Sequence, residues 1–359
     1  IMVSNLIQST YNAVDMLFVG RFTGTESLAA VSVCGPIMNV MIITLSGMSA
    51  GVLVVISSLL GAGENRQARD ASHTSVALYA IMAAVLTLVG LAFTPQLLLA
   101  VQTPLSAMPE AKRYLYTVFA GMSFSFGYNL IGALQRAQGN ATASMSFVLI
   151  SSIVNILLDA VLIVGLHMGA LGAALGTVLA QFVAFCVGAV QFTHGNTVLQ
   201  ISLGEVRFHI KHLKNILLFG VPTAANEVMV NLAMLTVSGV ANSFGLASSA
   251  AYGVGSRINS LAIFMDGAMN QTLSAYASQN IGAKNKMRAL TGLWKAIAIS
   301  VSMALVSSLT VLVFAEDFAA CFDANPEVVR QSAAFLRVTI WSYPLFAAVG
   351  PLIGFIRGT

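Results

Sequence analysis

Long apolar stretches separated by short polar segments run along almost the whole chain, and this pattern predicts the fold. A helix needs about 20 residues to cross the hydrocarbon core of a membrane. The apolar stretches reach that length, so each is predicted to be a membrane-spanning helix. The predicted helices cover residues 1–21, 27–61, 74–101, 112–134, 143–166, 169–192, 215–243, 247–280, 289–315 and 332–356. The fold class that follows is an all-α integral membrane protein with about ten visible transmembrane helices.

The polar segments between the helices divide the chain into two lobes. The longest of them, 193–214, carries several charged side chains and is predicted to be a cytoplasmic linker. Residues 1–192 form an N-lobe of six predicted helices, and residues 215–359 form a C-lobe that holds four. The chain begins and ends inside apolar stretches, so we expect it to be part of a longer protein.

A repeat with an offset of 221 residues links the two lobes. The matching positions are Gly24 with Gly245, Ala29-Ala30 with Ala250-Ala251, Gly61-Ala62 with Gly282-Ala283, and Arg136 with Arg357. Six helices, an even number, separate the copies, so both lobes are predicted to point the same way through the membrane, as parallel repeats do in transporters. The second copy lacks counterparts of the fifth and sixth helices. The intact protein is therefore predicted to have two pseudo-symmetric lobes of six helices.

The composition agrees with the helical pattern and excludes two classes of protein. Hydrophobic residues make up 57% of the chain and charged residues 8%, whereas soluble domains carry roughly 25% charged residues. The mean hydropathy is +0.85, so the expected partner is the lipid bilayer. A nucleic-acid partner is not expected despite the net charge of +4, because the basic residues lie in short loops and form no binding motif. Most of them follow even-numbered helices, which predicts that those loops are cytoplasmic.

Two carboxylates inside predicted helices, Asp15 and Asp159, are the main candidates for a functional site. An Asp near the middle of a membrane helix costs roughly 2.5–3.5 kcal/mol to insert and usually faces the interior of the bundle. The helical rise places Asp15, Asp159 and Thr177 about 9–12 Å below the predicted outer boundary, and Asn155 lies one turn from Asp159. These oxygens suit Na⁺, or a proton shared by the two carboxylates. The alternative is a set of interhelical hydrogen bonds with no role in transport.

Further polar residues inside the helices are candidates for lining a substrate cavity. They are Gln8, Tyr11, Asn12, Tyr114, Glu227, Asn231, Asp266 and Asn270. The alternative for the first three, which share a stripe with Asp15, is helix–helix contact; for Tyr114 it is a position at the membrane interface. Thr236 stands at the repeat position of Asp15, so we do not expect a second cation site. Gly172 and Gly176 form a GxxxG motif, which predicts close helix packing.

Several short motifs occur in a characteristic order along the chain. They are Val14-Asp15-Met16-Leu17-Phe18-Val19-Gly20-Arg21, Gly61-Ala62-Gly63 with its echo Gln279-Asn280-Ile281-Gly282-Ala283, Leu134-Gln135-Arg136-Ala137-Gln138-Gly139, Asn155-Ile156-Leu157-Leu158-Asp159, and Gly220-Val221-Pro222. With these motifs in this order, the chain resembles transporters of the multidrug and toxic compound extrusion (MATE) family, and in particular its prokaryotic, DinF-like branch.

The resemblance implies a secondary active antiporter that exports amphipathic, often cationic small molecules in exchange for H⁺ or Na⁺ by alternating access. Asp15, Asn155, Asp159 and Thr177 match the family's N-lobe cation-site pattern. Some members use a Glu of the seventh helix, and Glu227 lies about one turn early for that role. We expect a multi-pass protein of a bacterial or archaeal cell membrane, a monomer, with no cofactor beyond the coupling ion H⁺ or Na⁺.

Two other functions stay open on the sequence. A flippase for lipid-linked oligosaccharides, from the same superfamily, would need a strongly basic cavity, whereas the membrane interior here holds mainly acids. An intramembrane enzyme would use Asp15 and Asp159 as an acid pair. The chain has no GxxxxGK[ST] motif for an ATP-driven motor and no nucleophile or metal-binding motif, so the predicted protein is a transporter and not an enzyme.

Overall fold

The computed structural model describes residues 7, 18–19, 21–23, 25–194, 198–199, 208–262, 264–322 and 325–359. Every regular element in this part of the chain is a helix, which confirms the predicted fold class. Most of the first predicted helix lies outside the described residues. The chain forms two compact units, Ile1–Ala224 and Ala225–Thr359.

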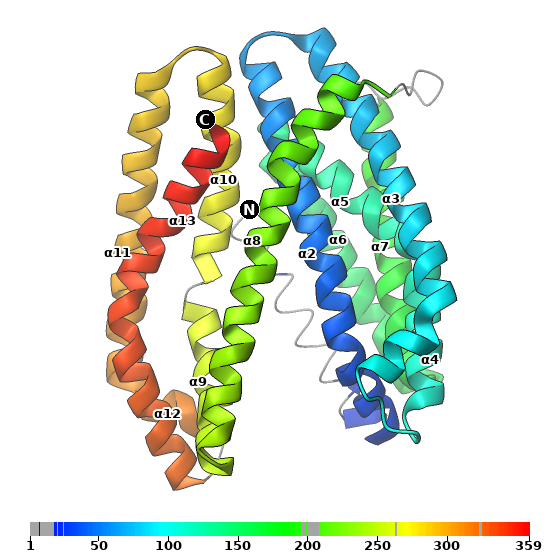
Figure 1. The fold of residues 1–359 in the computed structure, drawn as a ribbon, viewed down its shortest axis with the longest axis vertical. Coiled ribbons are helices and arrows are strands. Elements are labelled where there is room, and N and C mark those ends of the chain that lie inside the picture. Colours follow the sequence, from blue (N-terminus) through cyan, green and yellow to red (C-terminus); the bar gives the residue numbers. More distant parts are fainter. Residues whose placement is uncertain are drawn as a thin grey trace. The chain divides into compact units, whose positions relative to one another are not determined.

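The first unit is a bundle in which α7 packs against α4, α5, α6 and the short helix η1 (Figure 1). Its elements are α2 (Thr25–Gly61), α3 (Asn65–Ala100), α4 (Met108–Ala120), α5 (Met122–Ala137), α6 (Ala141–Asp159), the π-helix η1 (Ala160–Gly165), α7 (Gly169–His194) and the first part of α8 (Ile210–Ser243). The buried apolar side chains between them include several alanines, which allow helices to approach closely in a membrane.

The first part of α8 belongs to this unit because glycines let it approach α2. A Cβ at Gly51 would overlap the carbonyl oxygen of Ile216, and one at Gly47 would lie 2.8 Å from the carbonyl oxygen of Gly220. The border between the compact units therefore falls inside α8, after Ala224. The predicted linker, 193–214, lies partly outside the described residues, so the predicted lobe borders stay a prediction.

The second unit consists of the rest of α8 and the helices that follow it. These are α9 (Leu246–Ala262), α10 (Phe264–Gly282), α11 (Lys286–Ala320), α12 (Pro326–Thr339), the short 3₁₀ helix η3 (Ile340–Ser342) and α13 (Tyr343–Gly358). α10 and α13 lie side by side in it (Figure 1). A buried apolar cluster joins α9, α11, α12 and α13, and it includes Ile258, Val311, Leu336 and Tyr343.

The sequence repeat is also a repeat of structure. An offset of 221 carries the bounds of α2, 25–61, onto the start of α9 and the end of α10 at 246–282, and those of α5, 122–137, onto α13 at 343–358. It also carries the start of α3 at Asn65 onto the start of α11 at Lys286. The predicted pseudo-symmetry of the two halves is therefore confirmed for α2, α3 and α5 and their counterparts.

Some predicted helix bounds differ from the observed ones. The predicted helix 112–134 is two helices bent by 49°, which meet at Gly121, where a Cβ would overlap Val178 of α7. The predicted helix 247–280 is helical in its described residues, as α9 and α10, and residue 263 between them lies outside the described part. α3 begins at Asn65 and not at residue 74, because its first turns are polar and a hydropathy pattern detects only the apolar part of a helix that extends beyond the bilayer.

Seven helices of the described chain are long and apolar enough to cross a membrane, or eight if the bent pair α4–α5 counts as one span. α9 and α10 are not among them, and the first predicted helix lies mostly outside the described residues. The helical pattern therefore agrees with a multi-pass membrane protein.

Candidate functional site

The structure brings Asp159 and Asn155 together inside the first unit. Asp159 is the last residue of α6, and Asn155 lies one turn before it on the same face. The two side chains are 0% and 1% exposed, and Asn155 Nδ2 donates a hydrogen bond to Asp159 Oδ1 at 3.5 Å. Removing a carboxyl group from solvent in an apolar bundle is costly without polar partners. The pair is therefore the most conspicuous polar feature of this unit.

Gly176 of α7 lies against this pair. A Cβ at position 176 would overlap Asp159 Oδ1 and would lie 3.5 Å from Asn155 Nδ2. Thr177 is the next residue on α7 and is half-buried. The structure thus brings the helix of Thr177 to the pair, while the role of Thr177 as a ligand stays a prediction.

The helix changes its geometry directly after Asp159. Residues Ala160–Gly165 form the π-helix η1, and the amide of Leu166 donates to the carbonyl of Val161 at 2.9 Å. Single π turns inside α-helices are frequent at functional sites because the extra residue per turn displaces the neighbouring side chains. Nothing in the hydropathy pattern indicated this turn.

Four of the predicted site residues, Asp15, Gln8, Tyr11 and Asn12, lie outside the described residues. The described end of the first predicted helix nevertheless reaches the helices of the site. Val19 is buried against Ile163 of η1 and Ala173 of α7.

Tyr114 of α4 is half-buried and packs against the same cluster. Its ring therefore lies among the helices that hold the Asp159–Asn155 pair. Whether it lines a cargo path stays a prediction.

The predicted polar residues of the second unit are distributed over α8 and α10. On α8, Asn231 Nδ2 donates to the backbone carbonyl of Glu227 at 2.8 Å. On α10, Asn270 Oδ1 accepts a hydrogen bond from Arg357 Nη1 of α13 at 3.2 Å, and Glu227 has an attractive electrostatic interaction with the same Arg357. Asp266 lies one turn before Asn270, directly against Gly350 of α13.

Arg357 is a member of this polar group that the sequence did not indicate, although the repeat contained a signal for it. Its repeat counterpart, Arg136, ends α5 as Arg357 ends α13, and Arg136 Nη1 donates to Ser144 Oγ at 2.9 Å. Both arginines thus turn toward polar groups inside their own bundle.

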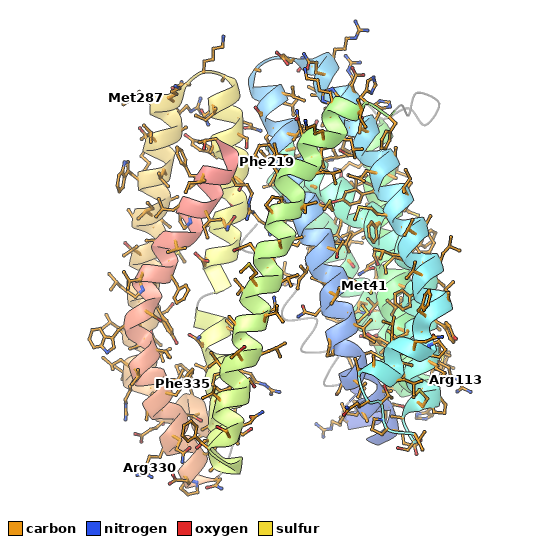
Figure 2. All side chains as sticks on the ribbon, viewed as in Figure 1. Met41, Arg113, Phe219, Met287, Arg330 and Phe335 are labelled. Carbon is orange, nitrogen blue, oxygen red and sulfur yellow. The ribbon has the colours of Figure 1, made fainter. Side chains whose placement is uncertain are left out.

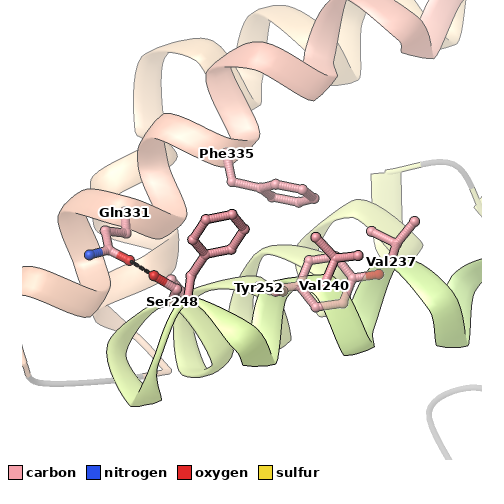
Figure 3. A pocket seen from close by; sticks show the side chains of 9 residues that line it. Val237, Val240, Ser248, Tyr252, Gln331 and Phe335 are labelled. Atoms are coloured by element: carbon pink, nitrogen blue, oxygen red, sulfur yellow. Dashed lines mark hydrogen bonds between the residues drawn. The ribbon is translucent and has the colours of Figure 1, made fainter.

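A pocket of about 330 Å³ opens among α8, α9 and α12 of the second unit (Figure 3). Val237, Val240, Tyr252 and Phe335 line it, and Ser248 Oγ donates to Gln331 Oε1 at 3.0 Å at its edge. Phe335, which contributes its ring to the lining, is labelled on its helix in Figure 2.

The repeat relates the lining of this pocket to a packed cluster of the first unit. The offset of 221 maps Val240 onto Val19 and Phe335 onto Tyr114, and in the first unit that position is filled by Ile163 of η1 and Ala173 of α7. Val19 is consequently 0% exposed, whereas Val240 is 55% exposed. The pocket is the open counterpart of a packed cluster, so we do not count it as part of the candidate site.

Apolar helices in two repeated sets, with a carboxyl–amide pair buried inside one set, are typical of a membrane transporter. The family model described as MatE matches residues 1–161 and 222–359, and the chain belongs to this family. The resemblance stated from the sequence motifs is thereby confirmed.

Relatives of known name agree with this assignment. The chain is 27% identical to the "probable multidrug resistance protein YoeA" of Bacillus subtilis, over 96% of this chain and 76% of that protein. It is 24% identical to the "multidrug export protein MepA" of Staphylococcus haemolyticus, over 95% of this chain and 75% of that protein. A solved structure of an outward-facing multidrug resistance MATE family transporter matches with a TM-score of 0.92 at 25% identity, covering 99% of this chain and 81% of that chain.

The protein is therefore a multi-pass membrane transporter of the MATE multidrug efflux family and not an enzyme. The alternative of an intramembrane enzyme with an acid pair is excluded by these relatives.

Proposed function

We propose that the protein exports amphipathic, cationic small molecules in exchange for H⁺ or Na⁺ by alternating access. Asp159 and Asn155 form the core of the coupling-ion site in this proposal, and Asp15 and Thr177 complete it. The coupling ion is itself transported, so it is a substrate and not a resident cofactor.

The observation that carries the proposal is the buried Asp159–Asn155 pair. An ionisable side chain inside a membrane bundle is costly, and the residues that persist there usually lie on ion or proton pathways. The carboxyl oxygens can accept a proton or coordinate Na⁺, and the amide oxygen of Asn155 offers one further hard ligand of the kind that Na⁺ takes. Both ions neutralise the carboxylate, so both reduce the cost of burying it.

The packing around the pair supplies a route from ion binding to conformational change. Asp159 is directly followed by η1, and Val19 at the end of the first predicted helix packs on Ile163 of η1. A change of charge at Asp159 therefore affects the junction at which η1 packs against the end of the first predicted helix. An ion that binds one arrangement of this junction more tightly than another shifts the equilibrium between them.

The distribution of charge supports a cationic cargo. Glu227 lies near the middle of α8, and Asp159 lies inside the apolar span Ala141–Gly165, where α6 meets η1. Asp266 lies in the first turn of α10, and Arg136 and Arg357 lie in the last turns of α5 and α13. Acidic groups along a path attract cations and repel anions. The printed names of the relatives, multidrug resistance and multidrug export proteins, agree with a broad small-molecule cargo.

The test is transport by the full-length protein reconstituted in liposomes. A fluorescent cationic dye is followed under a proton gradient alone and under a sodium gradient alone, with an anionic dye as the comparison. We expect gradient-driven movement of the cationic dye in the wild type and its loss in Asp159→Asn, because the amide can neither bind a proton at neutral pH nor neutralise Na⁺. Asp317→Asn, the same chemical change at an exposed position of α11, serves as the matched control and should transport normally.

Two results would contradict the proposal. Dye movement that persists in both Asp15→Asn and Asp159→Asn would remove the ion site from these carboxylates. The absence of movement under either gradient, for a panel of cationic compounds, would contradict the exporter function. The gradient that drives the wild type identifies the coupling ion.

A further inference from the structure

The two glycines of the GxxxG motif on α7 contact different kinds of groups. A Cβ at Gly172 would lie 3.2 Å from Ile163 Cγ1 and from the backbone carbon of Leu162, both in η1. A Cβ at Gly176 would overlap Asp159 Oδ1 and would lie 3.4 Å from Asp159 Cγ. Close helix packing explains Gly172. It does not explain why the group opposite Gly176 is a carboxylate and not an apolar side chain.

Gly176 covers one side of Asp159, and Asn155 occupies another. Asn155 Nδ2 donates to Asp159 Oδ1 at 3.5 Å. A Cβ added to Gly176 would lie 3.5 Å from the same nitrogen. The carboxylate is 0% exposed, so it cannot move away from α7 into solvent. Its position is therefore fixed between a hydrogen-bond donor of its own helix and the bare backbone of α7.

We propose that Gly176 is a positioning residue of the coupling-ion site, because its missing side chain lets α7 hold the Asp159 carboxylate in the geometry that the transported ion requires. The inference rests on the proposed role of Asp159. It adds a residue with no side chain of its own to the site, and it gives half of the GxxxG motif a function beyond packing.

A substitution at Gly176 follows directly from this geometry. Gly176→Ala places a methyl group where Oδ1 lies, so the carboxylate must rotate or α7 must move outward. A binding or reacting group displaced by about 1 Å can lose roughly a hundredfold in rate. We expect Gly176→Ala to raise the half-saturating concentration of the driving ion, H⁺ or Na⁺, roughly tenfold or more, in the full-length protein reconstituted in liposomes.

Gly188→Ala is the matched control on the same helix. A Cβ at Gly188 would meet only the tips of apolar side chains, with Ile131 Cγ2 at 3.0 Å as the nearest atom. It tests the effect of an added methyl group between α7 and its neighbours without touching Asp159. We expect its half-saturating ion concentration to equal that of the wild type, and an equal rise in both variants would overturn the proposal.

A double-mutant cycle tests the contact itself and does not depend on transport. Thermal unfolding of the purified protein is measured for Gly176→Ala in the wild type and in an Asp159→Ala background. If Gly176 rests on the carboxylate, the added methyl destabilises the wild type and is tolerated once Asp159 is truncated. The cycle remains informative if the Gly176→Ala variant does not fold, because the double variant, which lacks the carboxylate, should then fold again. Equal destabilisation in both backgrounds would contradict the inference.

Asp159→Asn separates this inference from the proposed function. Transport that survives Asp159→Asn removes the ion site and the inference built on it. Loss of transport in Asp159→Asn, together with a wild-type ion dependence in Gly176→Ala, leaves the ion site in place and removes only the role of Gly176.

Discussion

Asn155 gives the buried carboxylate of Asp159 a polar partner within its own helix. The two residues are one turn apart, so α6 alone sets their contact and no other helix has to be positioned for it. A hydrogen bond to a charged group contributes about 1.5–3 kcal/mol, and its loss in a buried place leaves the charged group poorly solvated. The amide therefore affects how firmly Asp159 is held and, in the proposed ion site, how easily Asp159 would exchange its ion.

We expect Asn155→Ala to reduce gradient-driven transport about tenfold, since a loss near 1.4 kcal/mol corresponds to that factor. The measurement is the initial rate of dye movement in proteoliposomes. Ser152→Ala is the control, because Ser152 is also buried on α6 but donates to the carbonyl of Val148 in its own helix, at 2.8 Å. Wild-type rates in Asn155→Ala would show that the amide has no part in coupling.

The sequence identified Asp159 and Asn155 because the residue types alone indicate polar ligands inside an apolar helix. Their spacing of four residues places both side chains on the same face of that helix. It could not identify Gly176 as a neighbour of Asp159, because that contact depends on how closely α7 approaches α6. A glycine in a membrane helix indicates close approach to something, but it does not say which group lies opposite. The same holds for Arg357, whose contact with Asn270 joins two helices.

At the scale of helices, α10 and α13 form the tightest described junction of the second unit. Gly350, Gly354 and Gly358 of α13 lie against Asp266, Asn270 and Ser274 of α10, each set spaced by one turn. Ser274 Oγ donates to the carbonyl of Gly354 at 3.1 Å. The glycines thus bring the two backbones together, and the side chain of Ser274 faces a backbone carbonyl of α13.

Gly354→Ala should destabilise the second unit by about 1–3 kcal/mol, as added atoms do in a well-packed interior. Its Cβ would overlap the backbone carbonyl oxygen of Asn270, and a backbone oxygen cannot rotate away as a side chain can. The measurement is the midpoint of thermal unfolding in detergent. Gly253→Ala on α9 is the control, because a Cβ there meets nothing within 4 Å, and an equal drop in both variants would contradict the explanation.

Helix positions could be predicted from the apolar pattern, whereas breaks and extensions could not. The pattern showed one helix at 112–134 because the residues around Gly121 are apolar on both sides. The bend of 49° lies at Gly121, where α7 approaches so closely that a Cβ would overlap Val178. It also missed the polar first turns of α3, which are helical outside the apolar stretch. The π turn after Asp159 depends on hydrogen-bond register and leaves no trace in hydropathy.

At the scale of the whole molecule, the repeat conserves architecture while the chemistry of the two halves diverges. The turn after α2 recurs after α10: the amides of Ala62 and Ala283 donate to the carbonyls of Ser58 and Gln279, at 2.9 and 3.0 Å. Asp15, a residue of the proposed ion site, does not recur, since Thr236 stands at its repeat position.

The parallel sense of the repeat predicts that both of these turns face the cytoplasm. Ala62 and Ala283 are exposed, so each can be replaced by Cys and probed with a membrane-impermeant maleimide. The background needs Cys186→Ser and Cys321→Ser, whereas Cys34 is buried and can stay. We expect both Ala62→Cys and Ala283→Cys to react only after cells are permeabilised.

Native Cys321 supplies the opposite control. It is exposed at the end of α11, next to the acidic segment that contains Glu316 and Asp317 and that the charge pattern places outside the cell. In the otherwise unmodified protein it should react in intact cells. An inverted repeat would place Ala62 and Ala283 on opposite faces, because an inverted copy runs through the membrane in the other direction. Labelling of one of them in intact cells would therefore contradict the parallel arrangement, while the helix-by-helix correspondence of the two halves would still stand.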